Sequence, residues 1–530
     1  MKTGRENRLS NLLLNKKRHY ERNKRSDGKA ILFNLVWSIV AIIINFAINF
    51  FVVPYVTDNI GIEAYGFVSL SNTFTSYVEV ITIALNSFVA RYITIAYHRN
   101  EYDKANVYFS STIIANIVLS ISVIIPSSLL ISKLEYFISI PGDLTQDVKI
   151  LFLLVLANHL ITTLQTAFNV SVFITNRLDL QTRKKCISFI IRAVILFALC
   201  YLFKPHVWYV GVASTFMILY LFYQNYLFTR VLTPEFKFSW KNVSFQSIKE
   251  LFFSGMWNSI NNLGNILNSG LDLLISNLML SPLAMGQVSV GKDLAVMCHT
   301  LIITIANTFR PTQARLYAIG EKEKLVRNLK LSMKITGMIS GIIISVFFVY
   351  GAPFLRLWLQ GREDFKLIFN LTLIALASDV AVGVVSPLYY VYTLTNKLKI
   401  PSFITIGMGL LNVISMYLLL KYSSLGVYAV VLTTLILNCV NYIDAPLYSA
   451  YCLKVPLKTF YPEIFKHVLS IIANIMIIYP LKKFLFITNS WMALIVNCSC
   501  CGAICLVITS LIVLNKEEYF LIIRRIFKKV

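Results

Sequence analysis

The chain has 530 residues, of which 57% are hydrophobic and 14% charged, whereas an ordinary soluble domain is about 25% charged. Its mean hydropathy is +0.68, and because a soluble domain cannot bury that much apolar surface, the excess must face lipid. These values exclude a disordered chain, a small disulfide scaffold and a conventional cytosolic enzyme. The net charge is +24, which suits an anionic membrane surface or an anionic substrate.

The apolar residues fall into fourteen segments, each long enough to cross a bilayer, for which about 20 residues suffice. Continuous apolar runs predict α-helices, because the strands of a membrane β-barrel would show ten-residue alternation. The fold class is therefore an all-α polytopic membrane protein. In chain order, the predicted spans cover about 30–53, 62–90, 107–132, 149–173, 186–203, 206–229, 249–278, 284–310, 331–357, 366–393, 400–420, 424–450, 464–486 and 490–514.

Lysine and arginine set the orientation of the spans, since cytoplasmic loops carry the excess of basic residues. If the N-terminus is cytoplasmic, the inner segments hold 37 basic residues and the outer loops 9. The remaining three, Arg192, Lys292 and Lys334, lie within spans. We therefore expect both termini on the cytoplasmic side of a bacterial plasma membrane. The nine cysteines form no paired CxxC framework and predict free thiols.

The two halves of the chain match when the sequence is shifted by 220 residues. Trp37 then falls on Trp257 and Asn45 on Asn265, and the pattern of Ala64, Gly66, Val68 and Ser69 returns in span eight. Both halves begin on the same side, which predicts parallel six-helix lobes around a shared pathway. The expected divisions are a basic cytoplasmic tail 1–29, an N-lobe 30–230, a cytoplasmic linker 231–248, a C-lobe 249–450, a final helix pair 451–515 and a basic C-terminal segment 516–530.

Local motifs carry a family resemblance over roughly residues 30–515. They are Glu63-Ala64-Tyr65-Gly66 after span one, Ala90-Arg91 followed by His98-Arg99-Asn100-Glu101 after span two, and Phe309-Arg310-Pro311 followed by Gly320-Glu321-Lys322-Glu323 after span eight. With fourteen spans in two lobes, the chain resembles the multidrug/oligosaccharidyl-lipid/polysaccharide exporter superfamily. Within it, the chain is similar to the polysaccharide flippases of the Wzx type.

The resemblance implies a flippase that moves a polyprenyl-(pyro)phosphate-linked oligosaccharide, of capsule, exopolysaccharide or teichoic-acid type, from the inner to the outer leaflet. It implies alternating access around a hydrated cavity lined by spans one, two, seven and eight. Expected partners are the lipid-linked saccharide, membrane lipids, a polysaccharide polymerase and glycosyltransferases. We expect no enzyme activity, no cofactor and no metal, and no nucleic acid as partner; an H+ or Na+ gradient would provide coupling.

Charged side chains inside spans are costly and therefore need partners or water. Asp272 and Lys292 lie about 9 Å and about 12 Å from the same membrane face, at 1.5 Å per residue, so a salt bridge between spans seven and eight is feasible. A diphosphate requires cations, and the candidates are Lys292, Arg91, Arg310 and Arg192. Candidates for an ion pair or ion coupling are Asp272, Asp293, Glu79, Asp379 and His299.

Asparagines form the most specific local pattern. Five of them in span seven recur at nearly helical spacing and predict a wet helix face, although hydrogen bonding between packed helices gives the same pattern. The candidate sugar contacts are Asn45, Asn49, Asn258, Asn261, Asn262, Asn265 and Asn268.

Two other functions compete with the flippase. A multidrug/cation antiporter of the same superfamily would favour acidic and aromatic cavity residues. A membrane-embedded glycosyl or acyl transferase would need paired carboxylates or a partnered histidine in an aqueous pocket, for which Asp272 and His299 are the nearest match.

Overall fold

The computed structural model describes residues 27–175, 177–360, 362–484, 490–515 and 518. Helices dominate this part of the chain, and the expected all-α class is confirmed. The basic tail up to residue 26 and nearly all of the predicted C-terminal segment 516–530 lie outside the described residues. The helix that contains the first span begins at Asp27.

Two compact units divide the chain between Ile266 and Leu267. The sequence prediction put the division at the linker 231–248, which the structure instead places inside unit 1. Unit 1 holds α2 (Asp27–Asn59), α3 (Ile62–Asn86), α4 (Val89–His98), α5 (Tyr102–Ser132), α6 (Thr145–Ile174), α7 (Leu178–Leu202), α8 (Tyr209–Leu232) and α9 (Phe245–Asn265).

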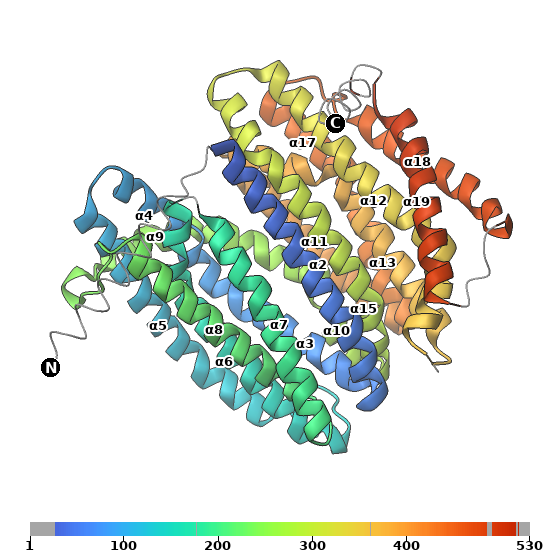
Figure 1. The fold of residues 1–530 in the computed structure, drawn as a ribbon, viewed down its shortest axis with the longest axis horizontal. Coiled ribbons are helices and arrows are strands. Elements are labelled where there is room, and N and C mark those ends of the chain that lie inside the picture. The colour runs from blue at the N-terminus through green and yellow to red at the C-terminus, as the bar shows by residue number, and fades with distance from the viewer. Residues whose placement is uncertain (1–26, 176, 361, 485–489, 516–517, 519–530) are drawn as a thin grey trace. The chain divides into compact units, whose positions relative to one another are not determined.

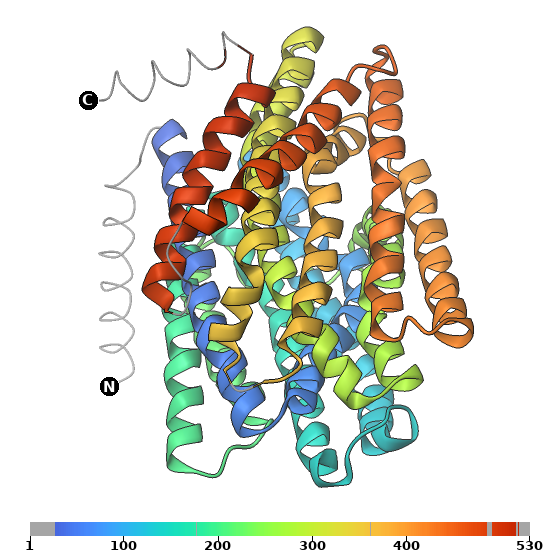
Figure 2. The same ribbon diagram turned by 90° about the vertical axis from the view of Figure 1, so that its right-hand side faces the viewer.

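Unit 2 follows the π-helical turn η4 (Ile266–Gly270), which joins α9 to the next helix. Its final pair of helices, α18 and α19, pack against each other and against α12 (Figures 1 and 2). The unit holds α10 (Asp272–Met279), α11 (Pro282–Ala318), α12 (Lys322–Trp358), α13 (Phe365–Val385), α14 (Tyr389–Leu394), α15 (Lys399–Tyr422), α16 (Val427–Cys439), α17 (Asn441–Leu453), α18 (Tyr461–Leu481) and α19 (Trp491–Val513).

Twelve helical segments in the described residues are long and apolar enough to cross a membrane. They coincide with twelve of the fourteen predicted spans, so the chain is a multi-pass membrane protein. The sixth and seventh predicted spans are helical as α8 and as α9, η4 and α10, but they fall short of the same criteria. The seventh falls short because a π-turn divides it and asparagines lower its hydropathy.

The 220-residue repeat recurs in the helix starts. α3 and α11 begin at Ile62 and Pro282, 220 residues apart, and the starts of α5 and α12 and of α6 and α13 are offset by the same number. The packing recurs too, since α6 contacts α3, α5 and α8 in unit 1 while α13 contacts α11, α12 and α16 in unit 2. Even the turns correspond: Asn100 and Gly320, again 220 apart, have φ of 59° and 75°, the left-handed region that lets one helix end and the next begin.

α9 belongs to unit 1 because it packs closely along α3. A Cβ at Gly255 of α9 would lie 2.0 Å from the carbonyl oxygen of Ala84 on α3, so only glycine permits this approach. The Tyr92 and Ser254 hydroxyls, 2.9 Å apart, and a hydrogen bond from the Tyr108 hydroxyl to Glu250 at 2.8 Å hold the same helix in place. The first half of predicted span seven is thus fixed within unit 1, and η4 is the point where the chain passes into unit 2.

Candidate functional site

A line of polar side chains runs along α11 and is called here the polar stripe: Lys292, His299, Thr300, Asn307 and Arg310. Thr300, Asn307 and Arg310 are exposed, and the Lys292 and His299 side chains are 21% and 42% exposed. At 100° per residue, Lys292, His299 and Arg310 lie within about 20° of one another around the helix. At 1.5 Å per residue the stripe is about 27 Å long, close to the ~30 Å hydrocarbon thickness of a bilayer. The face is mixed, because the apolar Val296 within it is also exposed.

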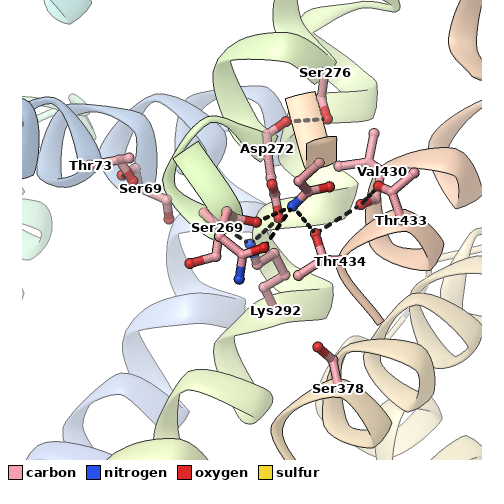
Figure 3. A network of polar contacts seen from close by, with 12 residues as sticks. Ser69, Thr73, Ser269, Asp272, Ser276, Lys292, Ser378, Val430, Thr433 and Thr434 are labelled. Carbon is pink, nitrogen blue, oxygen red and sulfur yellow. Dashed lines mark hydrogen bonds and ion pairs between the residues drawn. The ribbon is translucent and has the colours of Figure 1, made fainter. Parts of the chain in front are cut away.

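An ion pair stands at one end of the polar stripe. The Lys292 ammonium donates a hydrogen bond to the Asp272 carboxylate and another, at 3.2 Å, to the carbonyl oxygen of Ser269 (Figure 3). Asp272 is 1% exposed and lies in the first turn of α10, where a helix dipole favours negative charge. The predicted contact between spans seven and eight is therefore present. It joins a buried anion to a cation that still reaches the surface.

The π-turn η4 explains how this ion pair is built. A π-turn breaks the regular i to i−4 hydrogen bonding and leaves backbone carbonyls available to other donors. Lys292 takes the carbonyl of Ser269, and the amide of Asn412 on α15 donates to the carbonyl of Asn268. Figure 3 shows these contacts converging on one point of unit 2.

A chain of amides extends from η4 to the neighbouring helices. The Asn268 amide donates to Asn438 of α16 at 3.0 Å, and the Asn438 amide donates to Ser378 of α13 at 2.8 Å. The Asn412 amide also lies 3.1 Å from the Thr434 hydroxyl. Four helices of unit 2 thus converge on the π-turn through side-chain hydrogen bonds, which hold its irregular backbone in one geometry.

A second ion pair lies next to this chain. His299 Nδ1 of the polar stripe is 3.2 Å from the Asp379 carboxylate of α13, and Asp379 follows Ser378 in sequence. The sequence analysis marked both residues as candidates for an ion pair or ion coupling without predicting that they pair. Asp293 is half-buried beside Lys292, and its predicted place off the line of the stripe follows from the helical 100° step.

In unit 1, Arg192 is the candidate cation deepest within a span. It lies on the face of α7 that also carries the fully buried Ser188 and Leu196, opposite the exposed Ile190 and Val194. Its Nε is buried and finds no hydrogen-bond partner among the described residues. Arg192 therefore points toward protein and is not neutralised as Lys292 is.

The other candidate cations lie nearer the helix ends. Arg91 is exposed on α4, with its guanidinium 5.8 Å from the ring centre of Phe88. Arg310 is exposed on α11, 5.2 Å from the ring centre of Tyr390. Both use an aromatic face as their contact, an arrangement that leaves the N–H groups free to bind anions.

The predicted asparagine set is divided between the units. Asn268 joins the network of unit 2, whereas the four others of span seven belong to α9 in unit 1, where the amide nitrogen of Asn262 is buried without a partner among the described residues. Asn45 and Asn49 are half-buried on α2, and Glu79 is exposed on α3. Their roles stay predictions.

Sequence reasoning missed Asn412, Thr434, Asn438 and Ser378. A signal was available, because an amide in an apolar span is costly and needs a partner, and Asn412 is the only asparagine of predicted span eleven. No group of three or more His, Cys, Asp or Glu side chains that could hold a metal occurs in the described part of the chain.

Comparisons with known proteins agree with this architecture. A family described as "Polysaccharide biosynthesis protein" matches residues 31–317. The chain is 28% identical over 502 residues to the uncharacterized membrane protein EpsK of Bacillus subtilis (strain 168), covering 94% of this chain and 98% of that protein.

Solved structures share the fold. The lipid II flippase MurJ in an inward closed conformation aligns with a TM-score of 0.64 at 14% identity, covering 91% of this chain and 98% of MurJ. An inward-facing multidrug resistance MATE family transporter of the MOP superfamily aligns with a TM-score of 0.61, also at 14% identity, covering 77% and 94%. The polysaccharide branch expected from the sequence motifs is confirmed by the family match, and the fold by these structures.

Proposed function

The chain belongs to the polysaccharide biosynthesis protein family, and we propose that it is a flippase that moves a polyprenyl-(pyro)phosphate-linked oligosaccharide from the inner to the outer leaflet. Its saccharide is of capsule, exopolysaccharide or teichoic-acid type. Both termini are cytoplasmic in the bacterial plasma membrane, and a polymerase and glycosyltransferases are its metabolic partners. The chain is a transporter without catalytic residues.

The polar stripe of α11 is the observation that supports this function most directly. A helix that faced only lipid along this line would place five polar or charged residues in hydrocarbon, at several kcal/mol for the charged ones. The stripe therefore faces water over about 27 Å of its length, enough for a hydrated sugar to cross while its prenyl tail stays in lipid. The line from Lys292 to Arg310 carries cations at both ends, which suits an anionic headgroup.

The proposed mechanism is alternating access between two lobes related by the 220-residue repeat. Asparagines of α2 and α9 contact sugar hydroxyls, and Arg91, Arg192 and Arg310 contact the phosphates. Lys292 can join them only by leaving Asp272. Coupling uses an H+ or Na+ gradient, with Asp379, His299 and Glu79 as candidate ion-binding groups.

The test is complementation of surface polymer in a strain that lacks the chain. Arg310→Ala should abolish surface polymer at normal protein abundance, whereas Lys104→Ala, which removes an exposed cation of a surface ion pair, should leave polymer at the wild-type level. Arg310→Lys tests whether the planar guanidinium is needed. Normal polymer in a strain without the chain would refute the proposed function.

A multidrug/cation antiporter is the second candidate, favoured by the fold shared with MATE transporters and by the half-exposed Asp379 of the His299 pair. An antiporter would protect cells against cationic dyes. Unchanged dye sensitivity in a strain lacking the chain, together with loss of surface polymer, decides for the flippase.

A further inference from the structure

The ion pair between Asp272 and Lys292 is asymmetric. The Asp272 carboxylate is buried, with its Oδ1 unpartnered among the described residues, while the Lys292 side chain is 21% exposed and belongs to the polar stripe. A lysine side chain has four rotatable carbons and can swing its ammonium toward the surface. The aspartate is fixed in the first turn of α10 and has no comparable freedom.

An anionic headgroup on the stripe competes with Asp272 for the same ammonium. If Lys292 turns to a phosphate oxygen, Asp272 is left as an unpaired buried carboxylate. Leaving one partner of a buried pair uncompensated costs about 3–5 kcal/mol, and a buried ionisable group in that position takes up a proton instead of remaining charged.

No other cation in the vicinity can replace Lys292. The charged or titratable groups on the elements packed against α10 and α11 are Asp293 and Cys298, the pair of His299 with Asp379, Cys439 of α16, and Lys334 of α12. His299 is held by Asp379, and Lys334 by Glu518 at 2.6 Å. The groups that contact η4 from α15 and α16 are neutral amides and a hydroxyl.

We propose that Asp272 and Lys292 form an exchange site that binds a phosphate group of the substrate and one proton together. In this step the hydrogen bond from Lys292 Nζ to Asp272 Oδ2 breaks, one from Nζ to a phosphate oxygen forms, and Asp272 accepts one proton from solvent. Lys292 keeps all of its protons. When the phosphate leaves, the proton leaves and the ion pair forms again. This inference rests on the proposed function and names the coupled ion.

The direction of coupling has a consequence for the driving force. A headgroup that travels outward with a bound proton runs against an inward proton gradient. The exchange site therefore sets the affinity for the headgroup, and removal of the flipped lipid by later polymerisation supplies the drive.

The experiment measures proton uptake when the purified full-length protein in micelles binds inorganic pyrophosphate. Calorimetry in two buffers of different ionisation enthalpy counts the protons. The wild-type protein should take up about one proton more per pyrophosphate than Asp272→Asn does. Because one proton binds with each ligand, its affinity should rise about tenfold per unit fall in pH relative to that variant, by linkage.

Three variants make the result decisive. Asp272→Asn frees Lys292 and should bind pyrophosphate at least as tightly as wild type, without the extra proton. Lys292→Met should lose binding at this point, and Lys292→Met with Asp272→Asn restores a neutral pair and checks that the fold survives. Glu135→Gln breaks a different carboxylate–lysine pair, 2.7 Å long and outside the spans, and should behave as wild type.

Two outcomes overturn the exchange site: equal proton uptake by wild type and Asp272→Asn, or unchanged pyrophosphate binding by Lys292→Met. A wild-type protein that binds no pyrophosphate at any pH overturns it as well. These results are distinguishable from failure of the proposed function, which would show as normal surface polymer in a strain without the chain.

Discussion

The buried Lys334 of α12 offers a quantitative test of how the last helix pair is attached. Its side chain is 3% exposed and lies 2.6 Å from Glu518 and 4.0 Å from Glu463 of α18. Lys324, two and a half turns earlier on the same helix, forms a 2.9 Å pair with Glu321, but its side chain is 66% exposed. The two lysines therefore make the same kind of bond in opposite surroundings.

Removal of Lys334 leaves Glu463, itself 7% exposed in its side chain, without its cation. Deleting one partner of a buried pair costs about 3–5 kcal/mol, more than a hundredfold in the folding equilibrium, since 1.4 kcal/mol is tenfold. The exposed pair of Lys324 is worth about 0–1 kcal/mol. Lys334→Ala should therefore destabilise the protein by at least about 2 kcal/mol more than Lys324→Ala does.

Equilibrium unfolding of the purified protein in mixed micelles, followed by tryptophan fluorescence, measures both variants. A triple variant, Lys334→Met with Glu463→Gln and Glu518→Gln, should recover most of the lost stability because no charge remains unpaired. Equal destabilisation by Lys334→Ala and Lys324→Ala would refute the reasoning.

The same cluster predicts a pH dependence. Burial alone would raise the pKa of Glu518, but the hydrogen bond from Lys334 outweighs it and holds the pKa below the ordinary 4.5. A carboxyl group with a lowered pKa stabilises the fold above its unfolded-state pKa, and that stability is lost as the pH falls through the lowered value. The stability gap between wild type and Lys334→Met should therefore narrow below about pH 4.5; a constant gap there would contradict it.

Two further substitutions test the packing around the candidate site. Gly255→Ala should lower protein abundance, because its Cβ would strike the carbonyl of Ala84, whereas Gly407→Ala, with nothing within 4 Å of the new Cβ, should be neutral or stabilise by up to about 1 kcal/mol. Western blots of membrane fractions compare them. Asn412→Ala removes the donor that holds the π-turn carbonyl and should abolish surface polymer, whereas Asn370→Ala, which loses only an exposed bond to a tyrosine hydroxyl, should not; equal polymer from both would contradict the network.

Much of the architecture could be read from the sequence because it depends on local quantities. The lengths of apolar runs give the spans, and the recurrence at 220 residues predicts the common helix starts of α3 and α11. The contact of Asp272 with Lys292 could be foreseen from depth alone, since both positions lie a fixed rise from the same membrane face.

Other parts of the site depend on contacts between residues far apart in the chain. The pairing of His299 with Asp379 spans 80 positions, and Asn412 reaches the carbonyl of Asn268 over 144. The break of predicted span seven at η4 also escaped prediction, because a π-turn has no period of its own in the sequence.

The sequence by itself determined a membrane protein of many helices, built twice and carrying costly charges within its spans. The tertiary structure decided which charges neutralise each other: it paired Lys292 and left Arg192 without a partner for its Nε in the described residues. The physical reason is that hydropathy and periodicity are sums over neighbours in the chain. The state of a buried charge depends instead on a single partner a few ångströms away, and that partner comes from another helix.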